Sequence, residues 1–379
     1  MDACGILIIG GGPAGSSCAW KLRQAGYDVL VLDKKAFPRD KICGGWITPA
    51  VLEELQIDPQ EYARERVLQP ITGFRTSCMG GPEIETSYAG AVSYGIRRLE
   101  FDHFLLRRSG ARVLEGVPLT SLERSENTWI VNGDIRADML VGAGGHFCPV
   151  ARHLGANARK EIAVTAQEIE FEMSPQQREG CTIQAEIPEL YFCPDMKGYG
   201  WCFRKGSFLN VGLGRLDPHA FPGYAASFLG FLKRAGKIRF ALPQSRMPGH
   251  AYLLFDETPR RITDDGVLLV GDAAGLAYSQ SGEGIRPAVE SGLLAAETII
   301  AAKRNYARNE LGRYRELLQA RFGGAGKDWT SALGRHLPGN LLQCAARVLL
   351  ANGWLSRRLV LDRWFLHRNE PPLARHANA

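Results

Sequence analysis

The stretch that decides the fold runs from Ile6 to Gly15 and reads ILIIGGGPAG. Its four branched apolar residues favour a strand that is buried on both faces of a parallel sheet. Gly10, Gly12 and Gly15 then fit the pattern G-x-G-x-x-G. The first glycine of this pattern permits a tight turn, the second lets a ligand approach the backbone, and the third lets a helix pack closely on the strand. The stretch therefore predicts a strand, a glycine turn and a helix, the opening unit of a doubly wound α/β domain.

The residues that follow complete this unit. An amphipathic run leads to Gly26, which is placed to end a helix, and a second apolar run ends at Asp33, 18 positions after Gly15. The start of the helix offers unpaired N–H groups and the positive end of its dipole to an anion. An acid at the end of the second strand can bond ribose hydroxyls. We therefore predict a bound dinucleotide; the alternative is that the glycines only form a turn.

Composition limits the class of protein. The chain has 379 residues, which indicates two or three domains with a sizeable core. None of its apolar runs approaches the ~18 residues of a membrane span. The nine cysteines are scattered without a C-x-x-C pair, which favours a reducing cytoplasm over a disulfide framework or a zinc site. His146, Cys148 and His153 have a loose metal-like spacing, but they fall in a turn and we predict no metal.

The net charge of +6 is unevenly distributed. From Lys303 to the end the chain has 14 Lys/Arg and 5 Asp/Glu, whereas the remainder is slightly acidic. Such a basic segment, which also holds Trp329, Trp354 and Trp364, can meet an anionic membrane surface or a diphosphate substrate. The alternative is a solvated face of C-terminal helices. We expect no nucleic-acid partner.

Glycines mark two further places where the backbone can approach a ligand. After the second strand, a charged loop leads into Cys43, Gly44 and Gly45. Ligands of open α/β folds lie at this edge of the sheet. Much later, another apolar run ends in Gly271 and Asp272, which repeats the pattern of a buried strand followed by an acid and small residues. We expect the two strand ends to converge on one nucleotide.

Three segments together resemble flavoproteins of the p-hydroxybenzoate hydroxylase superfamily. They are the N-terminal glycine unit, the pattern Arg98-x-x-Phe101-Asp102, and the run that begins at Gly271. Within that superfamily the chain resembles the geranylgeranyl reductase family, over residues 1 to about 320. The residues that carry this likeness are Pro38 to Gly45, Gly198 to Phe203, Gly282 to Ile285, and Glu290 to Gly292.

The resemblance implies FAD as the cofactor. By this resemblance Arg98 reaches the flavin side of the pyrophosphate, Val117 contacts adenine through its backbone, and Asp272 bonds the ribityl chain or pyrophosphate. Backbone N–H groups from Gly282 to Ile285 are expected at the pyrimidine edge, where a helix N-terminus stabilises anionic reduced flavin by about 0.3–2 kcal/mol. The expected cofactor-binding residues are Gly10, Gly12, Pro13, Ala14, Gly15, Asp33, Lys34, Cys43, Gly44, Arg98, Val117, Gly271, Asp272, Gly282, Gly284 and Ile285.

The resemblance also implies a substrate site. Tyr199, Trp201 and Phe203 alternate along a predicted strand, so they share one face and are expected to wall the substrate; ordinary core packing is the alternative. Arg204 stands where the reductase pattern has a proline, which favours a more polar or anionic substrate unless the side chain points outward. Cys43 is the candidate catalytic acid, or a polar group beside the flavin, because the glycines after it let the loop approach the ring.

The expected activity is that of an FAD-dependent oxidoreductase. Hydride from N5 of reduced flavin would go to one carbon of a C=C bond in a prenyl-type or similar hydrophobic substrate, and an acid would protonate the other carbon. The first alternative is a monooxygenase that hydroxylates an aromatic or polyketide-like substrate. A flavin-dependent halogenase and a non-catalytic flavin-binding redox protein are further alternatives. The chain has no second G-x-G-x-x-G, so NAD(P)H must bind transiently or a separate electron-donor protein must act.

The expected fold class is α/β. It comprises a Rossmann-like FAD domain of the glutathione reductase type, a mainly antiparallel β-sheet substrate domain and a C-terminal helical region. The assigned boundaries are 1–70, 96–160 and 255–303 for the FAD domain, 71–95 and 161–254 for the substrate domain, and 304–379 for the helical region. Residues 51–66 are predicted as a helix and 181–187 as a strand. We expect a cytoplasmic protein, with peripheral membrane contact through the basic C-terminal region as an open alternative.

Overall fold

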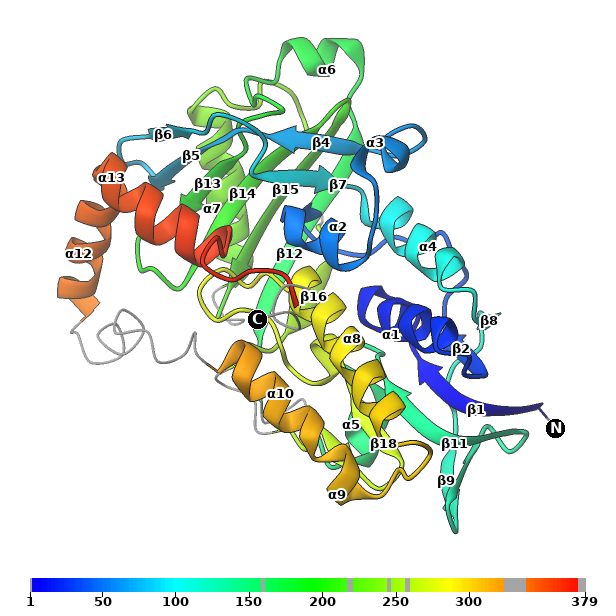
Figure 1. The fold of residues 1–379 in the computed structure, drawn as a ribbon. Helices are drawn as coiled ribbons and strands as arrows, with labels where there is room; N and C mark the ends of the chain where they lie inside the picture. Colours follow the sequence, from blue (N-terminus) through cyan, green and yellow to red (C-terminus); the bar gives the residue numbers. More distant parts are fainter. Residues whose placement is uncertain are drawn as a thin grey trace. The chain divides into compact units, whose positions relative to one another are not determined.

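Two compact units make up the chain. The computed structural model describes residues 2–157, 161–216, 221–243, 247–255, 260–323 and 339–373. Unit 1 comprises Met1–Asp40, Leu99–Ile162 and Tyr252–Asp328, and unit 2 comprises Lys41–Arg98, Ala163–Ala251 and Trp329–Ala379. The chain therefore passes back and forth between the units, and each unit is assembled from three separate stretches (Figure 1).

Unit 1 is built on a sheet whose centre is the first strand. Strand β1 (Asp2–Ile9) pairs in parallel with β2 (Val29–Asp33) on one side and β11 (Ile135–Gly142) on the other. Ile6, Leu7 and Ile8 have no exposed surface, as expected for a strand covered on both faces. The path β17-β18-β11-β1-β2-β8 is completed by β8 (Arg112–Glu115), β17 (Thr263–Asp264) and β18 (Val267–Leu269), and β9 (Leu122–Ser125) and β10 (Thr128–Val131) extend it beside β11.

Helices α1 and α8 of unit 1 lie side by side (Figure 1). Gly292 of α8 faces the carbonyl oxygen of Ala14 in α1 so closely that a side chain there would overlap it. Tyr314 fixes α10 by donating its hydroxyl hydrogen to the Leu269 carbonyl at 3.0 Å. The unit's helical segments are α1 (Pro13–Gln24), α4 (Arg98–Arg108, whose first residue belongs to unit 2), α5 (Pro149–His153), η2 (Gly271–Ala273), α8 (Ile285–Ala301), α9 (Arg308–Leu311) and α10 (Arg313–Phe322).

Unit 2 holds a seven-stranded sheet and a three-stranded sheet. The larger sheet has the order β16-β12-β15-β14-β13-β5-β6 and the smaller one β3-β7-β4. Among the large-sheet pairs whose register is known, β13–β5 is parallel and the others are antiparallel. The strands are β3 (Trp46–Ile47), β4 (Leu68–Ile71), β5 (Gly73–Cys78), β6 (Ile84–Ser87), β7 (Ser93–Ile96), β12 (Val164–Glu172), β13 (Glu189–Phe192), β14 (Gly198–Lys205), β15 (Phe208–Arg215) and β16 (Gly249–Tyr252).

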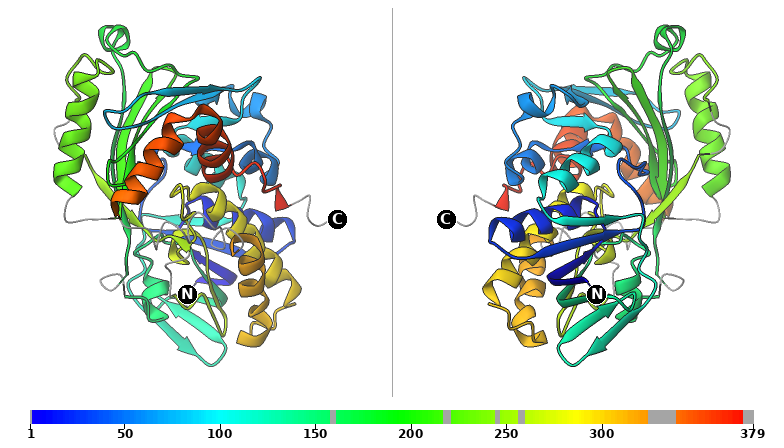
Figure 2. Two further views of the ribbon diagram at one scale, coloured as in Figure 1. Left: turned by 90° about the vertical axis from the view of Figure 1, so that its left-hand side faces the viewer. Right: turned by 90° about the vertical axis from the view of Figure 1, so that its right-hand side faces the viewer.

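The two faces of the seven-stranded sheet are covered differently. One face packs against α7 (Phe221–Arg234) through an apolar core that includes Tyr191, Val211 and Phe228. The opposite face, which we call the Cys43 face, carries Glu168, Trp201, Phe203 and Asn210. Figure 2 shows α7 on one side of this sheet and the C-terminal helices on the other.

The end of the chain belongs to the core of unit 2. Phe365, at the end of the π-helical segment η4 (Ser356–Phe365), has no exposed surface and contacts the rings of Trp46, Phe192 and Tyr199. The Ser356 hydroxyl lies 2.8 Å from that of Thr76 in β5. Preceding η4 are α12 (Gly339–Ala351) and α13 (Gly353–Leu355). Residues after 303, expected as one helical region, thus contribute α9 and α10 to unit 1 and these segments to unit 2.

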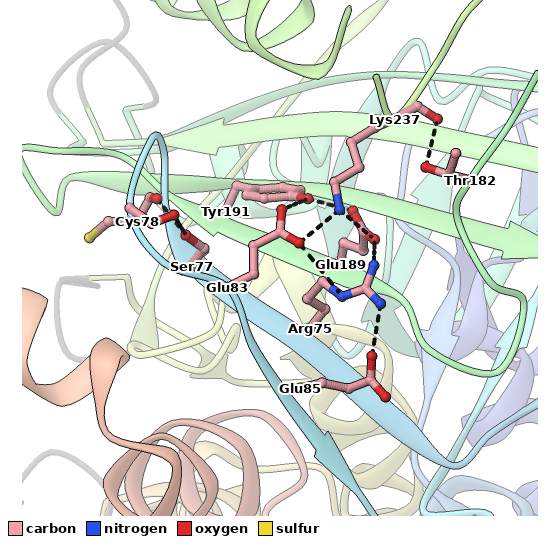
Figure 3. A network of polar contacts seen from close by, with 10 residues as sticks. Arg75, Ser77, Cys78, Glu83, Glu85, Thr182, Glu189, Tyr191 and Lys237 are labelled. Carbon is pink, nitrogen blue, oxygen red and sulfur yellow. Dashed lines mark hydrogen bonds and ion pairs between the residues drawn. The ribbon is translucent and has the colours of Figure 1, made fainter. Parts of the chain in front are cut away.

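A polar network lies on the α7 face of the large sheet (Figure 3). Buried Glu189 pairs with Arg75 at 2.5 Å and with Lys237 at 3.1 Å, and it accepts a hydrogen bond from Tyr191. Lys237 also reaches Glu83, at 2.9 Å. Each charged group therefore has partners of opposite charge, which is the condition for burying such groups.

The α/β fold class predicted from the sequence is confirmed, and the differences are local. The helix expected over 51–66 is two short helices, α2 (Pro49–Glu54) and α3 (Pro59–Tyr62), because Pro59 begins a new helix rather than continuing the first. No strand covers 181–187, where only Cys181 bridges to Ile238. Residues 41–70 belong to unit 2, because β7 pairs with both β3 and β4. None of the described helices is long and apolar enough to cross a membrane.

We predict that Phe365→Ala destabilises unit 2 by about 3–5 kcal/mol, because it removes a fully buried ring and leaves a cavity among aromatic side chains. Urea denaturation followed by circular dichroism would measure this loss. Trp354→Ala is the control, since Trp354 is 67% exposed and its removal should change stability by no more than about 0.5 kcal/mol. Equal stability of the two variants would contradict the assignment of Phe365 to the core.

Candidate functional site

The turn after β1 has no room for side chains at two of its glycines. Gly10 has a φ of +116°, a conformation that favours glycine, and a side chain there would overlap the backbone of Ala143. The carbonyl oxygen of Gly10 in turn occupies the position that a side chain at Gly15 would need. The first and third glycines of the pattern are therefore required by the backbone contact itself.

The start of α1 presents free backbone donors. No side chain caps this helix. In the part of the chain that the structure describes, the N–H groups of Gly12, Ala14 and Gly15 have no acceptor. The position of a side chain at Gly12 has nothing nearer than Arg39 Nη2, at 3.5 Å. Free donors at the positive end of a 12-residue helix suit a pyrophosphate, so these residues fit FAD.

Asp33 fastens the glycine turn to the end of β2. Its Oδ2 accepts a hydrogen bond from Gly11 N–H at 2.8 Å, and its Oδ1 accepts one from Lys35 N–H at 2.9 Å. Val117 donates its N–H to the Asp33 carbonyl at 2.9 Å. Asp33 and Val117, both expected at the adenosine end of the cofactor, are thus neighbours. The bond to Gly11 was not foreseen from the sequence.

The residues that follow β18 lie beside the turn that follows β1, within unit 1. Gly271 has a φ of +57°, and a side chain there would lie 2.9 Å from the Ala14 Cβ. A side chain at Gly284 would lie 3.5 Å from Asp272 Oδ1. The structure therefore brings Gly10 to Gly15, Gly271, Asp272 and Gly284 into one neighbourhood, as expected if both strand ends serve one ligand.

The donors expected from Gly282 to Ile285 are largely used within the chain. Gly282 donates its N–H to the Tyr278 carbonyl at 2.8 Å. The carboxylate of Glu283 accepts from Arg286 N–H at 2.7 Å and also from Ile285 N–H. Among the described residues, only Gly284 in this stretch keeps an N–H without an acceptor. The expectation of a row of free donors is corrected to one, because Glu283 caps the start of α8.

Glu283 is held in an unfavourable environment for a charge. Its Oε2 is buried and has no hydrogen-bond partner among the described residues. Burial raises the pKa of Glu283 to about 7, although the Arg286 N–H and the Arg286 charge oppose this shift. Glu283 therefore changes charge near neutral pH, two residues before α8 begins.

Unit 1 also contains a cavity of about 230 Å³ beside Lys34. His146 and Arg260 line it as well, and Arg260 is neutralised by Glu161 at 2.6 Å. Arg39, near Gly12, pairs with buried Asp102 at 3.4 Å, a contact between residues that no sequence pattern connects. No group of His, Cys, Asp and Glu that could hold a metal occurs in the described ranges, and the eight cysteines described there are free.

In unit 2, hydrogen bonds hold the Cys43 turn on the Cys43 face. Cys43 donates its N–H to Glu168 Oε1 at 2.6 Å and accepts one from Asn210 Nδ2 at its carbonyl, at 3.2 Å. The Gly45 carbonyl accepts from Ile96 N–H at 2.7 Å. A side chain at Gly44 would lie 3.1 Å from Phe203. The turn thus rests directly on an aromatic wall, and Gly44 permits that approach.

A buried polar cluster lies beneath this turn. Asn210 Nδ2 donates to Glu168 Oε2 at 3.0 Å and to Glu170 Oε2 at 3.2 Å, while Asn210 Oδ1 accepts from Trp201 Nε1 at 2.7 Å. Lys205, 1% exposed, donates to Glu170 at 2.6 Å. The sequence signal for this cluster was available, because Glu168 and Glu170 stand two apart in a strand, β12, and therefore share a face.

The expected substrate residues separate into two groups. Trp201 and Phe203 are buried on the Cys43 face, and Tyr199, half-buried, lies beside Trp201 with ring centroids 6.0 Å apart. Arg204 projects from the opposite face of β14, and its Nε donates to the Gly206 carbonyl at 3.1 Å. Arg204 therefore does not join the aromatic wall. Arg98 is buried at the first position of α4 and belongs to unit 2.

Comparison with known proteins extends over both units. Residues 8–58 match the model of the NAD(P)-binding Rossmann-like domain. The chain is 29% identical over 319 residues to the menaquinone reductase of Mycobacterium tuberculosis, which covers 79% of this chain and 77% of the relative. It is also 29% identical over 350 residues to digeranylgeranylglycerophospholipid reductase 2 of Methanosphaera stadtmanae, with 86% of each chain covered.

A solved structure shares the fold. It is described as a geranylgeranyl bacteriochlorophyll reductase-like protein from Thermoplasma acidophilum, and it superposes with a TM-score of 0.78 at 21% identity. The superposition covers 97% of this chain and 98% of the other. The shared architecture therefore includes the unit 2 sheets and is not limited to the glycine turn.

We predict that Glu283→Gln flattens the dependence of stability on pH. The folded-state pKa of Glu283, about 7, lies above its ordinary value, so its stabilising contribution is full below that ordinary value and falls as the pH rises toward 7. The free energy of unfolding, measured in urea at pH 5 and pH 8, should fall less between these values in the variant than in the wild type. Glu297→Gln, at a more exposed site on α8, should leave the slope unchanged.

Proposed function

We propose that this chain is an FAD-dependent oxidoreductase of the geranylgeranyl reductase type, and that it reduces carbon–carbon double bonds in the prenyl chain of a hydrophobic substrate. Both curated relatives described above are named as reductases, and one name specifies a lipid with two geranylgeranyl groups, which are prenyl chains. The reaction adds a hydride to one carbon of the double bond and a proton to the other.

One observation carries the proposal within this chain. The Cys43–Gly45 turn lies against Trp201 and Phe203, so a candidate proton-bearing residue borders an aromatic surface. Aromatic rings suit an extended apolar chain, and they exclude water from it. Tyr199 extends the same surface along β14. These side chains would bind and orient the prenyl chain, and Arg204, on the other face, is left out of the proposal.

The proposed cofactor is FAD, and the residues of unit 1 fit it. The N–H groups of Gly12, Ala14 and Gly15 would hold the pyrophosphate, with Pro13 fixing the helix start. Asp33, Val117 and Lys34 would contact the adenosine end. The proposed contacts at the flavin end come from Gly271, Asp272, Gly282, Gly284 and Ile285. Arg98, Cys43 and Gly44, which belong to unit 2, stay predictions of the family resemblance.

When bound and reduced, FAD supplies the hydride for such a reduction. Cys43 would hold a proton near the substrate, and its thiol accepts a hydrogen bond from Gly45 N–H at 3.4 Å. The aromatic surface would keep water away from the double bond. Electrons would reach the cofactor from transiently bound NAD(P)H or from a donor protein.

A lipid-like substrate makes peripheral membrane contact part of the proposal. Trp354 and Val348 are 67% and 63% exposed, and Arg357 and Arg358 are exposed nearby in sequence. Exposed apolar and basic side chains together suit the surface of an anionic bilayer.

The proposed activity predicts the mass of the product. The purified flavoprotein, reduced with dithionite without oxygen, should add two hydrogens for each double bond that it reduces in the prenyl chain of a geranylgeranyl-bearing glycerophospholipid or of menaquinone. Cys43→Ser should slow this reduction at least about tenfold, because a hydroxyl is a poorer acid than a thiol. Mass spectrometry of the lipid after timed incubation measures both effects.

Cys78→Ser is the matched control, because Cys78 is also a half-buried thiol of unit 2 but lies on β5. It should leave the rate unchanged. A product that gains one oxygen, and only in air, would favour the monooxygenase alternative. Flavin that is bound and reduced but never reoxidised by either lipid would contradict the proposed substrate class.

We predict that Asp33→Asn weakens flavin binding about 10–100-fold. An amide group can accept from only one of the two N–H donors that Asp33 now satisfies, so the glycine turn loses a charge-assisted bond. Fluorescence titration of the flavin-free protein with FAD measures the dissociation constant. Asp28→Asn, at an exposed site of unit 1, should retain the wild-type value. Equal affinities in all three proteins would remove Asp33 from the cofactor site.

A further inference from the structure

A buried carboxyl group holds the backbone of Cys43. We propose that Glu168 is a positioning residue for the reduction: its carboxylate fixes the Cys43–Gly45 turn, and a proton on that carboxylate loosens the turn. The connection to catalysis rests on the proposed function, whereas the contact itself is independent of it.

The bond from Cys43 N–H to Glu168 Oε1 is short, at 2.6 Å, and Glu168 is 5% exposed. Asn210 joins the same two residues from a second direction, because its Nδ2 donates to both Glu168 Oε2 and the Cys43 carbonyl. The amide of Asn210 cannot rotate to reverse these roles without losing the bond from Trp201 Nε1. Glu168 is therefore held as an acceptor toward both the turn and Asn210.

The proton of this cluster is expected on Glu168 and not on Glu170. Burial opposes the charge on Glu170, but Lys205 and Asn210 outweigh it and keep the pKa of Glu170 below its ordinary value. Glu168 forms no ion pair among the described residues. Burial, with a smaller contribution from the charge of Glu170, raises the pKa of Glu168 to about 7 against the Cys43 N–H bond, the charge of Lys205 and the bond from Asn210. Two carboxyl groups that share the donor Asn210 are thus separated in acidity by their surroundings.

Other charged groups face this cluster. Arg97 Nε lies 3.4 Å from Glu170 Oε1, whereas Lys205 bonds the other oxygen of that carboxylate, Oε2. Lys41 belongs to the loop that leads into the Cys43–Gly45 turn, and its Nζ lies 2.8 Å from His250 Nε2 on β16. His250 is therefore a second titratable group that acts on the loop, and variants of Glu168 are needed to separate the two effects.

Protonation changes the strength of the bond to the turn. A hydrogen bond to a carboxylate is roughly twice as strong as one to a neutral group. A protonated Glu168 also has a hydrogen to donate. Glu170 Oε2 can accept it, because both carboxyl groups already lie against the same Asn210 amide nitrogen. The Cys43 N–H would then keep only a weaker acceptor, so the turn is expected to be held more firmly above pH 7 than below it.

Amide hydrogen exchange at Cys43 tests this directly in the full-length flavoprotein without substrate. After correction for the intrinsic dependence of exchange on pH, protection of the Cys43 N–H should be about five- to tenfold greater at pH 8 than at pH 6. Glu168→Gln, which mimics the protonated form, should show the lower protection at both values. Glu172→Gln is the matched control on the same strand, where the carboxylate bonds Ser207 at the surface, and it should behave as the wild type.

Protection that does not change with pH in the wild type, or a Glu168→Gln protein with wild-type protection at pH 8, would overturn the proposal. If Glu168→Gln fails to fold, Glu170→Gln serves instead, because removal of the neighbouring charge should move the midpoint of the protection change to lower pH. The kcat/KM of lipid reduction should lose its inflection near pH 7 in Glu168→Gln. If exchange behaves as expected but neither lipid is reduced, the proposed function fails and the role of Glu168 in the turn stands.

Discussion

The contact between two backbone segments at the end of β1 is the constraint on which unit 1 depends. The carbonyl of Gly10 fills the space that a side chain at Gly15 would need. In the same way, the backbone of Ala143 fills the space that a side chain at Gly10 would need. Helix α1 can therefore start directly against the strand, which leaves its first donors free and lets Gly271 and Gly292 approach Ala14. Asp33 adds the bond to Gly11 that holds this arrangement from the neighbouring strand.

The large sheet of unit 2 has one apolar face and one face that carries charged side chains. One face of this sheet is an apolar core under α7, while the other buries Glu168 and Lys205, beside half-buried Glu170 and aromatic rings. Buried charges seldom stabilise a fold beyond what apolar residues of similar size would achieve. Their presence beneath a glycine turn, with each oxygen engaged, is better explained by a need to hold that turn in place.

Much of unit 1 could be predicted from the sequence, because its signals are local. An apolar run, three spaced glycines and a terminal acid each act within a few residues, and they identified β1, α1 and β2. The contacts of Glu283 and the bond from Asp33 to Gly11 could not be derived this way, since they depend on how the turns close.

In unit 2 the sequence pattern predicted the face shared by Trp201 and Phe203 but not what packs on it. Strand alternation is local, whereas the contacts of Glu168 with Cys43 and of Phe365 with Trp46 join residues far apart in the chain. The same alternation puts Arg204 on the face opposite Phe203. The expectation that Arg204 contacts the substrate came from the family resemblance and not from the strand period.

The burial of Phe365 has a consequence for how the protein is made. Unit 1 draws its last segment from residues up to Asp328, whereas the core of unit 2 needs the ring of Phe365, which comes later in the chain. A ribosome retains the most recently added residues in its exit tunnel, so the aromatic core of unit 2 can close only after the last residues of unit 1 have emerged. Unit 1 can therefore fold while the core beside the sheet that carries Cys43 still lacks the ring of Phe365.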